Sequence, residues 1–195
     1  MPTLSDRVAL IADAAVHVVA TRGMRGLTHR AVDAEAGLPQ GSTSAYFRTR
    51  KALVEGVVRR LADQDTAEVA ELVDVTDLDA LSAGMARVLD AWMTTGRERT
   101  LARYACLLEA THHPELRGIL AHGAQARDLA RRMLERAGVP DAERRGRALV
   151  AFVDGLLFDR LVGAGALNAP APGSPESRAE LTDAIRTALR GVFGS

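Results

Sequence analysis

Apolar residues recur at helical spacing along almost the whole chain, and this periodicity is the feature that most limits the possible folds. The face that this spacing predicts within residues 3–23 holds Leu4, Val8, Ile11, Ala15 and Val19. No segment convincingly shows the alternation of apolar and polar residues that indicates a half-buried strand. Aromatic residues make up only 4% of the chain, so we expect a core of Ala, Val and Leu in closely packed helices. The sequence predicts an all-α protein.

Turn and capping signals divide the chain into about nine helices. Gly23 and Gly37 are expected to end the first two helices, and Thr28 to cap the second. Thr76 is expected to cap the fifth helix, and Pro114 to lie in the first turn of the seventh. The expected helices are residues 3–23, 28–36, 40–46, 50–73, 80–96, 99–113, 114–138, 140–165 and a last helix from about 175.

The charges are unevenly distributed, although the formal net charge is zero. Residues 1–60 carry nine Arg or Lys against five Asp or Glu, whereas residues 61–195 carry sixteen against twenty. A basic head of about +4 suggests contact with a polyanion. Four excess charges are also typical of an ordinary solvated surface.

Cysteine usage and hydropathy predict a cytoplasmic protein. The single cysteine, Cys106, allows no internal disulfide and fits a reducing compartment. The N-terminus lacks the pattern of a signal peptide. The most apolar stretch, residues 148–162, is short and interrupted by charged residues, so it is not expected to span a membrane.

The segment at residues 37–47, GLPQGSTSAYF, is placed where a helix is expected but consists of poor helix formers. A helix that reads DNA needs small polar groups so that its backbone can approach base edges in the major groove. Packing of Leu38 and Phe47 must then offset the low propensity, which for glycine costs about 1 kcal/mol. An ordinary surface loop has a similar composition. The capped helix before the segment and the Arg- and Lys-led helix after it favour a helix-turn-helix.

Residues 7–55 resemble the DNA-binding domain of tetracycline-repressor-like (TetR/AcrR) bacterial transcriptional regulators. The matching features are Thr28, the turn Ala36-Gly37, the polar segment 40–46, Phe47 and Arg50. The resemblance implies a helix-turn-helix domain at residues 1–50 and an effector-binding and dimerisation domain at residues 51–195. It implies a cytoplasmic homodimeric repressor without a cofactor, which binds a palindromic operator in double-stranded DNA and is released by a small hydrophobic effector.

Three positions depart from the family pattern. Ser44 stands where the family has tyrosine, and an aromatic residue, Tyr46, follows two positions later. Pro39 replaces the usual small polar cap of the third helix, and Asp33 replaces a small apolar residue. We hypothesise that Asp33 accepts hydrogen bonds at the N-terminus of that helix, in place of the lost cap.

The candidate DNA contacts divide into base-reading and phosphate-binding groups. Gln40 can pair with adenine, and hydroxyl groups can contact bases of either kind. The base-reading candidates are Gln40, Gly41, Ser42 and Thr43, of which Thr43 either reads bases or faces the core. The phosphate candidates are Thr28, Ser44, Tyr46, Arg50 and Lys51. Arg50 and Lys51 also fit a solvated helix start, although cations are mildly unfavourable there unless an anion is near.

Two further sites are expected in the helical body. Residues 148–162 are apolar nearly all round, which predicts that a second copy covers this helix together with the last one. The expected dimer residues are Phe152, Leu156, Ile185 and Leu189. Met and aromatic residues at helical spacing are more often core than pocket, but they give the candidate effector site. Its residues are Met85, Trp92, Met93, Tyr104, Leu108 and Phe158.

A metal- or cofactor-binding enzyme is the alternative from a different class. Di-iron bundles use two Glu-x-x-His pairs, and the chain has one, Glu109 with His112. Cys106, His113 and His122 lie near it in sequence, but histidines at a helix end are more often surface residues. We therefore expect no metal site. A ligand-free helical adaptor is a third possibility.

Overall fold

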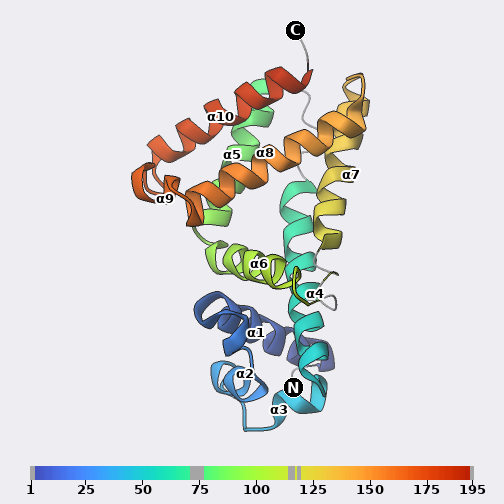
Figure 1. The fold of residues 1–195 in the computed structure, drawn as a ribbon, viewed down its shortest axis with the longest axis vertical. Helices are drawn as coiled ribbons and strands as arrows, with labels where there is room; N and C mark the ends of the chain where they lie inside the picture. The colour runs from blue at the N-terminus through green and yellow to red at the C-terminus, as the bar shows by residue number, and fades with distance from the viewer. Residues whose placement is uncertain (1–2, 71–76, 114–116, 118–119, 194–195) are drawn as a thin grey trace. The chain divides into compact units, whose positions relative to one another are not determined.

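The computed structural model describes residues 3–70, 77–113, 117 and 120–193. Within these ranges the chain forms ten helices and no strand, so the predicted all-α class is confirmed (Figure 1). The helices are α1 Leu4–Gly26, α2 His29–Glu35, α3 Ser42–Tyr46, α4 Arg50–Ala70, α5 Leu78–Met93, α6 Arg97–Glu109, α7 Leu120–Arg136, α8 Ala142–Val162, α9 Gly165–Asn168 and α10 Pro175–Phe193.

The additional helix is α9, a single turn where the sequence predicted only the end of a helix and a loop. Gly163 ends α8 in an extended conformation, and the Ala169 amide then closes α9 by donating to the Gly165 carbonyl. Thr76 and Pro114 themselves lie outside the described residues. The cap predicted at Thr76 is wrong, because Asp77 caps α5 by accepting the Ala80 amide at 2.6 Å. No described helix combines the length and apolar character that a membrane crossing requires.

The chain forms two compact units, which are described separately. The first comprises Met1–Asp65 and Glu98–Ala121, and the second comprises Thr66–Arg97 and His122–Ser195. Almost all of α6 thus belongs to the first unit, with α1, α2, α3 and most of α4. The predicted functional boundary at residue 50 stays a prediction, because compactness does not reveal which residues bind DNA or ligand.

An apolar core joins α1, α2, α4 and α6 within the first unit. Fully buried side chains from these helices include Ile11, Val32, Leu61 and Cys106. Local signals set the helix ends as predicted: Thr3 and Asp6 form a capping box on α1, and Thr28 caps α2. Gly23 breaks α1 with a φ of 66°, although a short helical turn follows it as far as Gly26.

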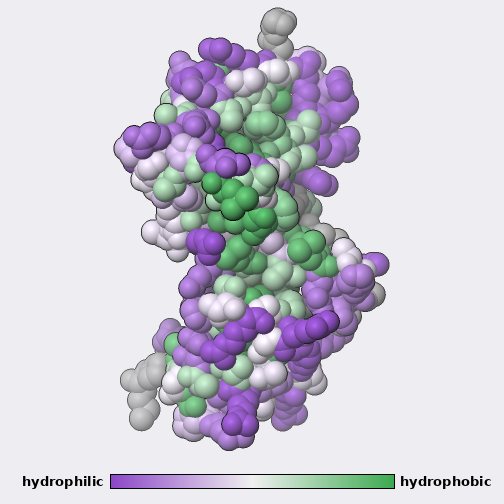
Figure 2. All heavy atoms as spheres, turned by 60° about the vertical axis from the view of Figure 1, so that its left-hand side comes forward, coloured by the Kyte–Doolittle hydropathy of each residue, from purple (hydrophilic) through white to green (hydrophobic). Residues whose placement is uncertain are grey.

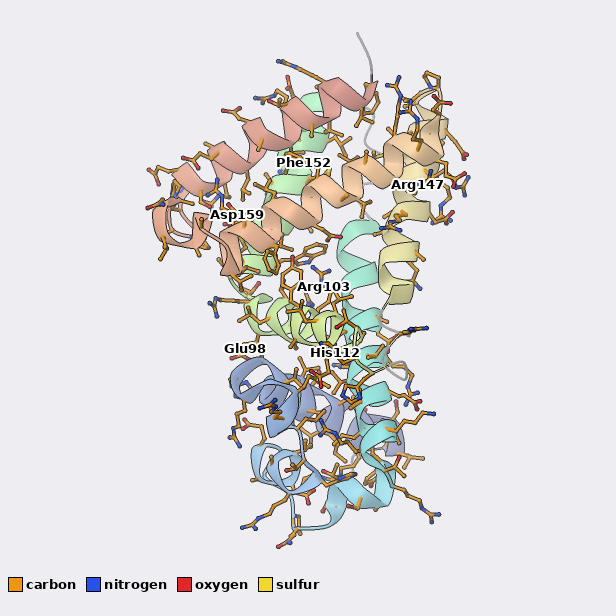
Figure 3. All side chains as sticks on the ribbon, in the orientation of Figure 1. Glu98, Arg103, His112, Arg147, Phe152 and Asp159 are labelled. Carbon is orange, nitrogen blue, oxygen red and sulfur yellow. The ribbon has the colours of Figure 1, made fainter. Side chains whose placement is uncertain are left out.

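Polar contacts fasten the outer surfaces of the same helices. Arg60 on α4 donates two hydrogen bonds to the Asp13 carboxylate on α1, at 2.6 and 2.8 Å. His17 on α1 lies between two carboxylates, with Nδ1 2.7 Å from Glu98 of α6 and Nε2 3.5 Å from Glu35 of α2. Glu98 is labelled beside α1 in Figure 3. These contacts tie α2, α4 and α6 to α1.

The second unit is organised around α5 and α10, which pack against each other (Figure 1). The apolar stripe of α10, Leu181, Ile185 and Leu189, is fully buried. Asp90 of α5 accepts hydrogen bonds from the Gly173 amide at 2.7 Å and from Arg178 at 3.1 Å. This pair of bonds fixes the start of α10 against α5.

Candidate nucleic-acid interface

The turn between α2 and α3 presents the residues that were predicted to read DNA. Gly37 leaves α2 with a φ of 64°, and Gly41 enters α3 with a φ of 94°, both in the region that favours glycine. Gln40 and Gly41 therefore lie in a turn, and α3 itself starts at Ser42. The side chains of Gln40 and Ser44 are exposed, and Ser42 is half-buried. These three polar residues stay on the accessible surface.

The Asp33 side chain accepts two backbone amides of this turn and of the start of α3, which confirms the hypothesis that it replaces the missing cap. Its side chain is buried, with 3% of its surface exposed. Oδ2 accepts the Gly41 amide and Oδ1 accepts the Thr43 amide, each at 2.7 Å. Gly41, the N-cap residue of α3, has no side chain to cap the helix. The carboxylate of α2 therefore satisfies amides that no local side chain reaches.

The ionised form of Asp33 is favoured in spite of its burial. Burial acts to raise the pKa of the Asp33 carboxyl, but hydrogen bonds from Thr43 and Gly41 and the nearby His29 outweigh it and leave this pKa below its usual value. The Thr43 hydroxyl lies close enough to contribute, although its Oγ1 atom makes no well-formed hydrogen bond. A carboxylate is thus the stable species at this position.

Thr43 corrects one of the base-reading assignments. Its side chain is 0% exposed. Of the two roles considered from the sequence, base reading or packing in the core, the structure therefore shows the second. In a five-residue helix that begins at Ser42, a side chain on the inner face cannot also reach a base edge. Gln40, Gly41 and Ser42 remain as base-reading candidates.

The C-terminal end of α3 is anchored by Phe47. Its ring is 5% exposed and belongs to the apolar core, and Leu38 packs against the same core. A Cβ atom on Gly56 of α4 would lie 2.6 Å from Phe47 Cε1, so only glycine leaves room for the ring. His29 Nε2 lies 2.6 Å from the Phe47 carbonyl oxygen. The predicted apolar anchors are confirmed, whereas Gly56 and His29 gave no recognisable signal in the sequence.

The residues predicted to bind phosphate differ in their exposure and in whether their polar groups already contact other residues of the protein. Lys51 is 66% exposed and 4.0 Å from Glu55, and Tyr46 is 38% exposed. Thr28 is exposed, but its hydroxyl caps the Ala31 amide at 3.1 Å. Ser44 is exposed at the surface of α3.

Arg50 has a structural role that the sequence did not indicate. Its guanidinium donates to the Leu27 carbonyl and, at 2.8 Å, to the Met24 carbonyl. It therefore links the start of α4 to the end of α1, instead of presenting a free cation. Two neighbours were missed: Arg48 is exposed between α3 and α4, and Thr49 caps α4 by accepting the Ala52 amide at 3.0 Å.

Comparison with known proteins places this geometry in a family. Residues 11–57 match the sequence profile of the tetR family of bacterial regulatory proteins, and residues 76–194 match that of the tetracyclin repressor-like C-terminal domain. The chain belongs to the TetR family. No curated protein matches it.

Several solved structures resemble the chain along nearly its whole length. A transcriptional regulator from Rhodococcus sp. Rha1 is 26% identical, with a TM-score of 0.78 over 99% of this chain and 100% of that one. A TetR family member from Streptomyces coelicolor is 29% identical, with a TM-score of 0.72 over 94% and 98%. The multidrug binding protein EbrR, complexed with ethidium, is 31% identical, with a TM-score of 0.65 over 93% and 99%. Other EbrR structures contain proflavin or malachite green.

The effector candidates of this TetR-family chain do not all fall in one unit. On α5, Trp92 and Met93 are buried and Met85 is half-buried. On α6, which belongs to the first unit, Tyr104 is half-buried and Leu108 is 64% exposed. Phe158 on α8 is 41% exposed. A surface concavity at the α7–α8 turn is lined by Glu135, Val139, Asp141, Ala142, Glu143, Arg144 and Arg147, none of which was an effector candidate.

The dimer candidates require a correction. Ile185 and Leu189 are 0% exposed because they face α5 in the core of their own unit, so they have no surface with which to touch a second copy. Phe152, by contrast, is 41% exposed near the middle of α8, where Figure 3 labels it. Leu156 is half-buried. The apolar surface that remains available lies on α8.

The histidines of the alternative enzyme hypothesis do not converge with Cys106. Burial, together with the charge of Glu109, raises the pKa of the Cys106 thiol to about 12, and its sulfur lies 3.8 Å from Met24 Sδ in the core. His112 is exposed, and His113 pairs with Glu109 at 3.3 Å. The side chain of His122 lies outside the described residues. Among the residues that are described, no three His, Cys, Asp or Glu side chains are placed to hold a metal ion.

Proposed function

We propose that this chain is a ligand-responsive, DNA-binding transcriptional regulator of the TetR family that represses its target as a homodimer. It would act in the cytoplasm, where it binds a palindromic operator and is released by a small hydrophobic effector. It would regulate and not catalyse, and the proposed function needs no cofactor.

The observation that carries this proposal is the accessible polar surface of Gln40, in the turn, and Ser42, at the start of α3, which is anchored on an apolar unit. Asp33 fixes its N-terminal end with two 2.7 Å bonds, and the buried ring of Phe47 fixes its C-terminal end. A structural loop has no need of anchors at both ends, whereas base readout requires side chains in fixed positions. The exposed cation of Lys51, in the first turn of α4, fits a phosphate backbone.

A palindromic operator requires a dimer, and the outer face of α8 offers a surface for one. Ala148, Ala151 and Gly155 are exposed on that helix, with Phe152 at 41% and Val162 at 48% exposure. Figure 2 shows hydrophobic residues gathered on one face of the second unit. We propose that the same face of a second copy covers it, because an exposed stripe of small and apolar residues allows two helices to approach closely.

A hydrophobic effector is supported by the second unit and by the relatives. Trp92 and Met93 are buried in a mainly aliphatic body, and Met and aromatic side chains are typical of adaptable apolar pockets. EbrR, a multidrug binding protein of similar length, has been solved with ethidium, proflavin and malachite green, which are aromatic dyes. We propose an effector of the same general character, an apolar or amphipathic aromatic compound.

The test is a binding selection with fragments of the DNA that surrounds the gene. The proposal expects enrichment of one palindromic sequence, protection of two successive major grooves about 34–36 Å apart, and loss of binding at high salt. An all-helical protein that enriches no sequence in this experiment would contradict the proposed function. Stoichiometric binding of iron or zinc in the same preparation would instead favour the enzyme alternative.

A further inference from the structure

Asp33 is the one buried carboxylate in the described part of the first unit whose two oxygens both bind backbone amides of the reading turn. It is 3% exposed, and the two amides belong to Gly41 and Thr43, eight and ten residues later in the chain. Those two residues flank Ser42, and Gly41 directly follows Gln40. The carboxylate therefore holds the backbone on both sides of one base-reading candidate and next to the other.

Leu38 packs on the core and donates its amide to the Asp33 carbonyl at 2.9 Å, but little else apart from the Asp33 carboxylate fixes the turn around Gly41. Gly41 adopts a φ of 94° with nothing within 4 Å of where a Cβ would lie, and it makes no side-chain cap. Pro39 lacks an amide hydrogen, and its carbonyl accepts the Ser42 amide at 3.1 Å. A glycine of this kind can change its backbone angles at small cost. Without an acceptor at Asp33, Gln40 and Ser42 would occupy a range of positions.

We propose that Asp33 is a positioning residue for DNA sequence recognition, which acts through the Gly41 and Thr43 amides to fix Gln40 and Ser42 against base edges. This inference rests on the proposed function. By this proposal the Asp33 side chain contributes to the sequence specificity of DNA binding, although it is buried and cannot touch DNA itself. The reason is geometric, because a bidentate contact to a base tolerates displacements of only about 0.5 Å.

The same bonds affect how α3 can approach DNA. The Gly41 and Thr43 amides are committed to Asp33, so they are not available to bind a phosphate. A negative charge also lies just below the reading surface, which disfavours close approach of any duplex. Both effects reduce binding that is independent of sequence, and they increase the share of affinity that depends on Gln40 and Ser42.

The experiment measures affinity for the selected palindrome and for a scrambled duplex of the same composition, at one salt concentration. Asp33→Asn removes one acceptor, and Asp33→Glu keeps the charge but displaces it by one methylene group. Each should lower the ratio of the two affinities by about tenfold. Asp33→Glu keeps the charge and should change affinity for scrambled DNA little, whereas Asp33→Asn removes the charge and should leave that affinity unchanged or raise it. Asp63→Asn, which removes an exposed charge from α4, is the matched control and should leave the ratio within about twofold.

A double mutant separates positioning from general stability. If Asp33 acts by placing Gln40, then Asp33→Asn in a Gln40→Ala background should reduce the ratio by much less than it does in the wild type, because the two changes share one interaction. Additive effects, or equal losses on both duplexes by folded Asp33→Asn and Asp33→Glu proteins, would overturn the inference. Wild-type protein that fails to discriminate between the duplexes would refute the proposed function itself, and the inference with it.

Discussion

At the scale of single residues, Asp33 replaces a cap that Pro39 cannot supply. This replacement could be predicted from the sequence because Pro39, at the usual cap position, and Asp33, the residue that accepts the amides instead, lie only six positions apart. Arg50 is the opposite case. Its role depends on carbonyls 23 and 26 residues away. The residues next to Arg50 in the sequence do not show whether its guanidinium binds these backbone carbonyls or a DNA phosphate.

Replacement of Asp33 by alanine should destabilise the protein measurably. Two amides in a buried position would lose their acceptor, which costs about 1–3 kcal/mol of the free energy of unfolding. Urea denaturation at pH 7 measures this difference. A variant as stable as the wild type would show that water or a local rearrangement serves the amides equally well.

The pH dependence of this contribution follows from the lowered pKa of Asp33. A carboxyl with a lower pKa in the folded state stabilises the fold fully above its unfolded pKa, about 3.9, and loses that contribution as the pH falls through the folded value. The stability difference between wild type and Asp33→Asn should therefore be constant from pH 7 to about pH 5 and shrink below about pH 4. A difference that grows on acidification would contradict the assignment.

Gly56→Ala tests the anchor at the other end of α3. Alanine favours helix by about 1 kcal/mol over glycine, but here its Cβ would lie 2.6 Å from the Phe47 ring. Overpacking costs about 1–3 kcal/mol, so we expect a net loss of stability. Gly191→Ala on α10, where a Cβ meets nothing within 4 Å, is the matched control and should be neutral or slightly stabilising. Equal effects of the two changes would mean that Phe47 moves aside freely.

At the scale of elements, the sequence correctly predicted those helix ends and breaks that are set by residues close together in the chain. The caps at Thr3 and Thr28 and the break at Gly23 are local, and the structure has them where the sequence places them. The burial of Thr43 and the membership of α6 in the first unit depend on packing between distant helices. Helical periodicity shows that a face is apolar, but it does not show which partner covers that face. This limitation also explains the error at Ile185 and Leu189, whose stripe was correctly identified but assigned to a second copy.

The helix-turn-helix should separate base reading from backbone anchoring. Gln40→Ala should relax the preference at one base pair and cost about 1–3 kcal/mol on the selected site. Lys51→Ala should weaken all sequences alike and lower the slope of log affinity against log salt by about one. Competition binding at several salt concentrations measures both effects. Equal weakening of selected and random DNA by Gln40→Ala would show that the turn does not read bases.

Arg50→Ala serves as a contrast to Lys51→Ala. Because Arg50 donates to the Met24 and Leu27 carbonyls at the end of α1, its loss should reduce the free energy of unfolding. The exposed Lys51 should affect stability very little. A salt slope that changes for Arg50→Ala without a loss of stability would restore the phosphate role that the sequence suggested.

At the scale of the whole molecule, the proposed dimer depends on the exposed face of α8. Phe152→Arg and Val162→Glu place charges on surfaces that are 41% and 48% exposed, so each should leave the fold intact and shift sedimentation from dimer to monomer. Glu176→Arg, at an exposed position on α10, changes charge to a similar extent and should leave the dimer unchanged. A wild-type protein that sediments as a monomer at micromolar concentration would contradict this interface.

The switch between DNA-bound and released states places a thermodynamic condition on any effector. A ligand lowers operator affinity a hundredfold only if its binding free energy differs by about 2.7 kcal/mol between the two states, and operator DNA must weaken ligand binding by the same factor. Trp92, the single tryptophan and 8% exposed, provides a fluorescence signal in the second unit. Titration of hydrophobic aromatic compounds, with and without the selected operator, should yield two unequal dissociation constants for the true effector. A compound that fills the second unit but binds equally well in both titrations cannot release DNA, however tightly it binds.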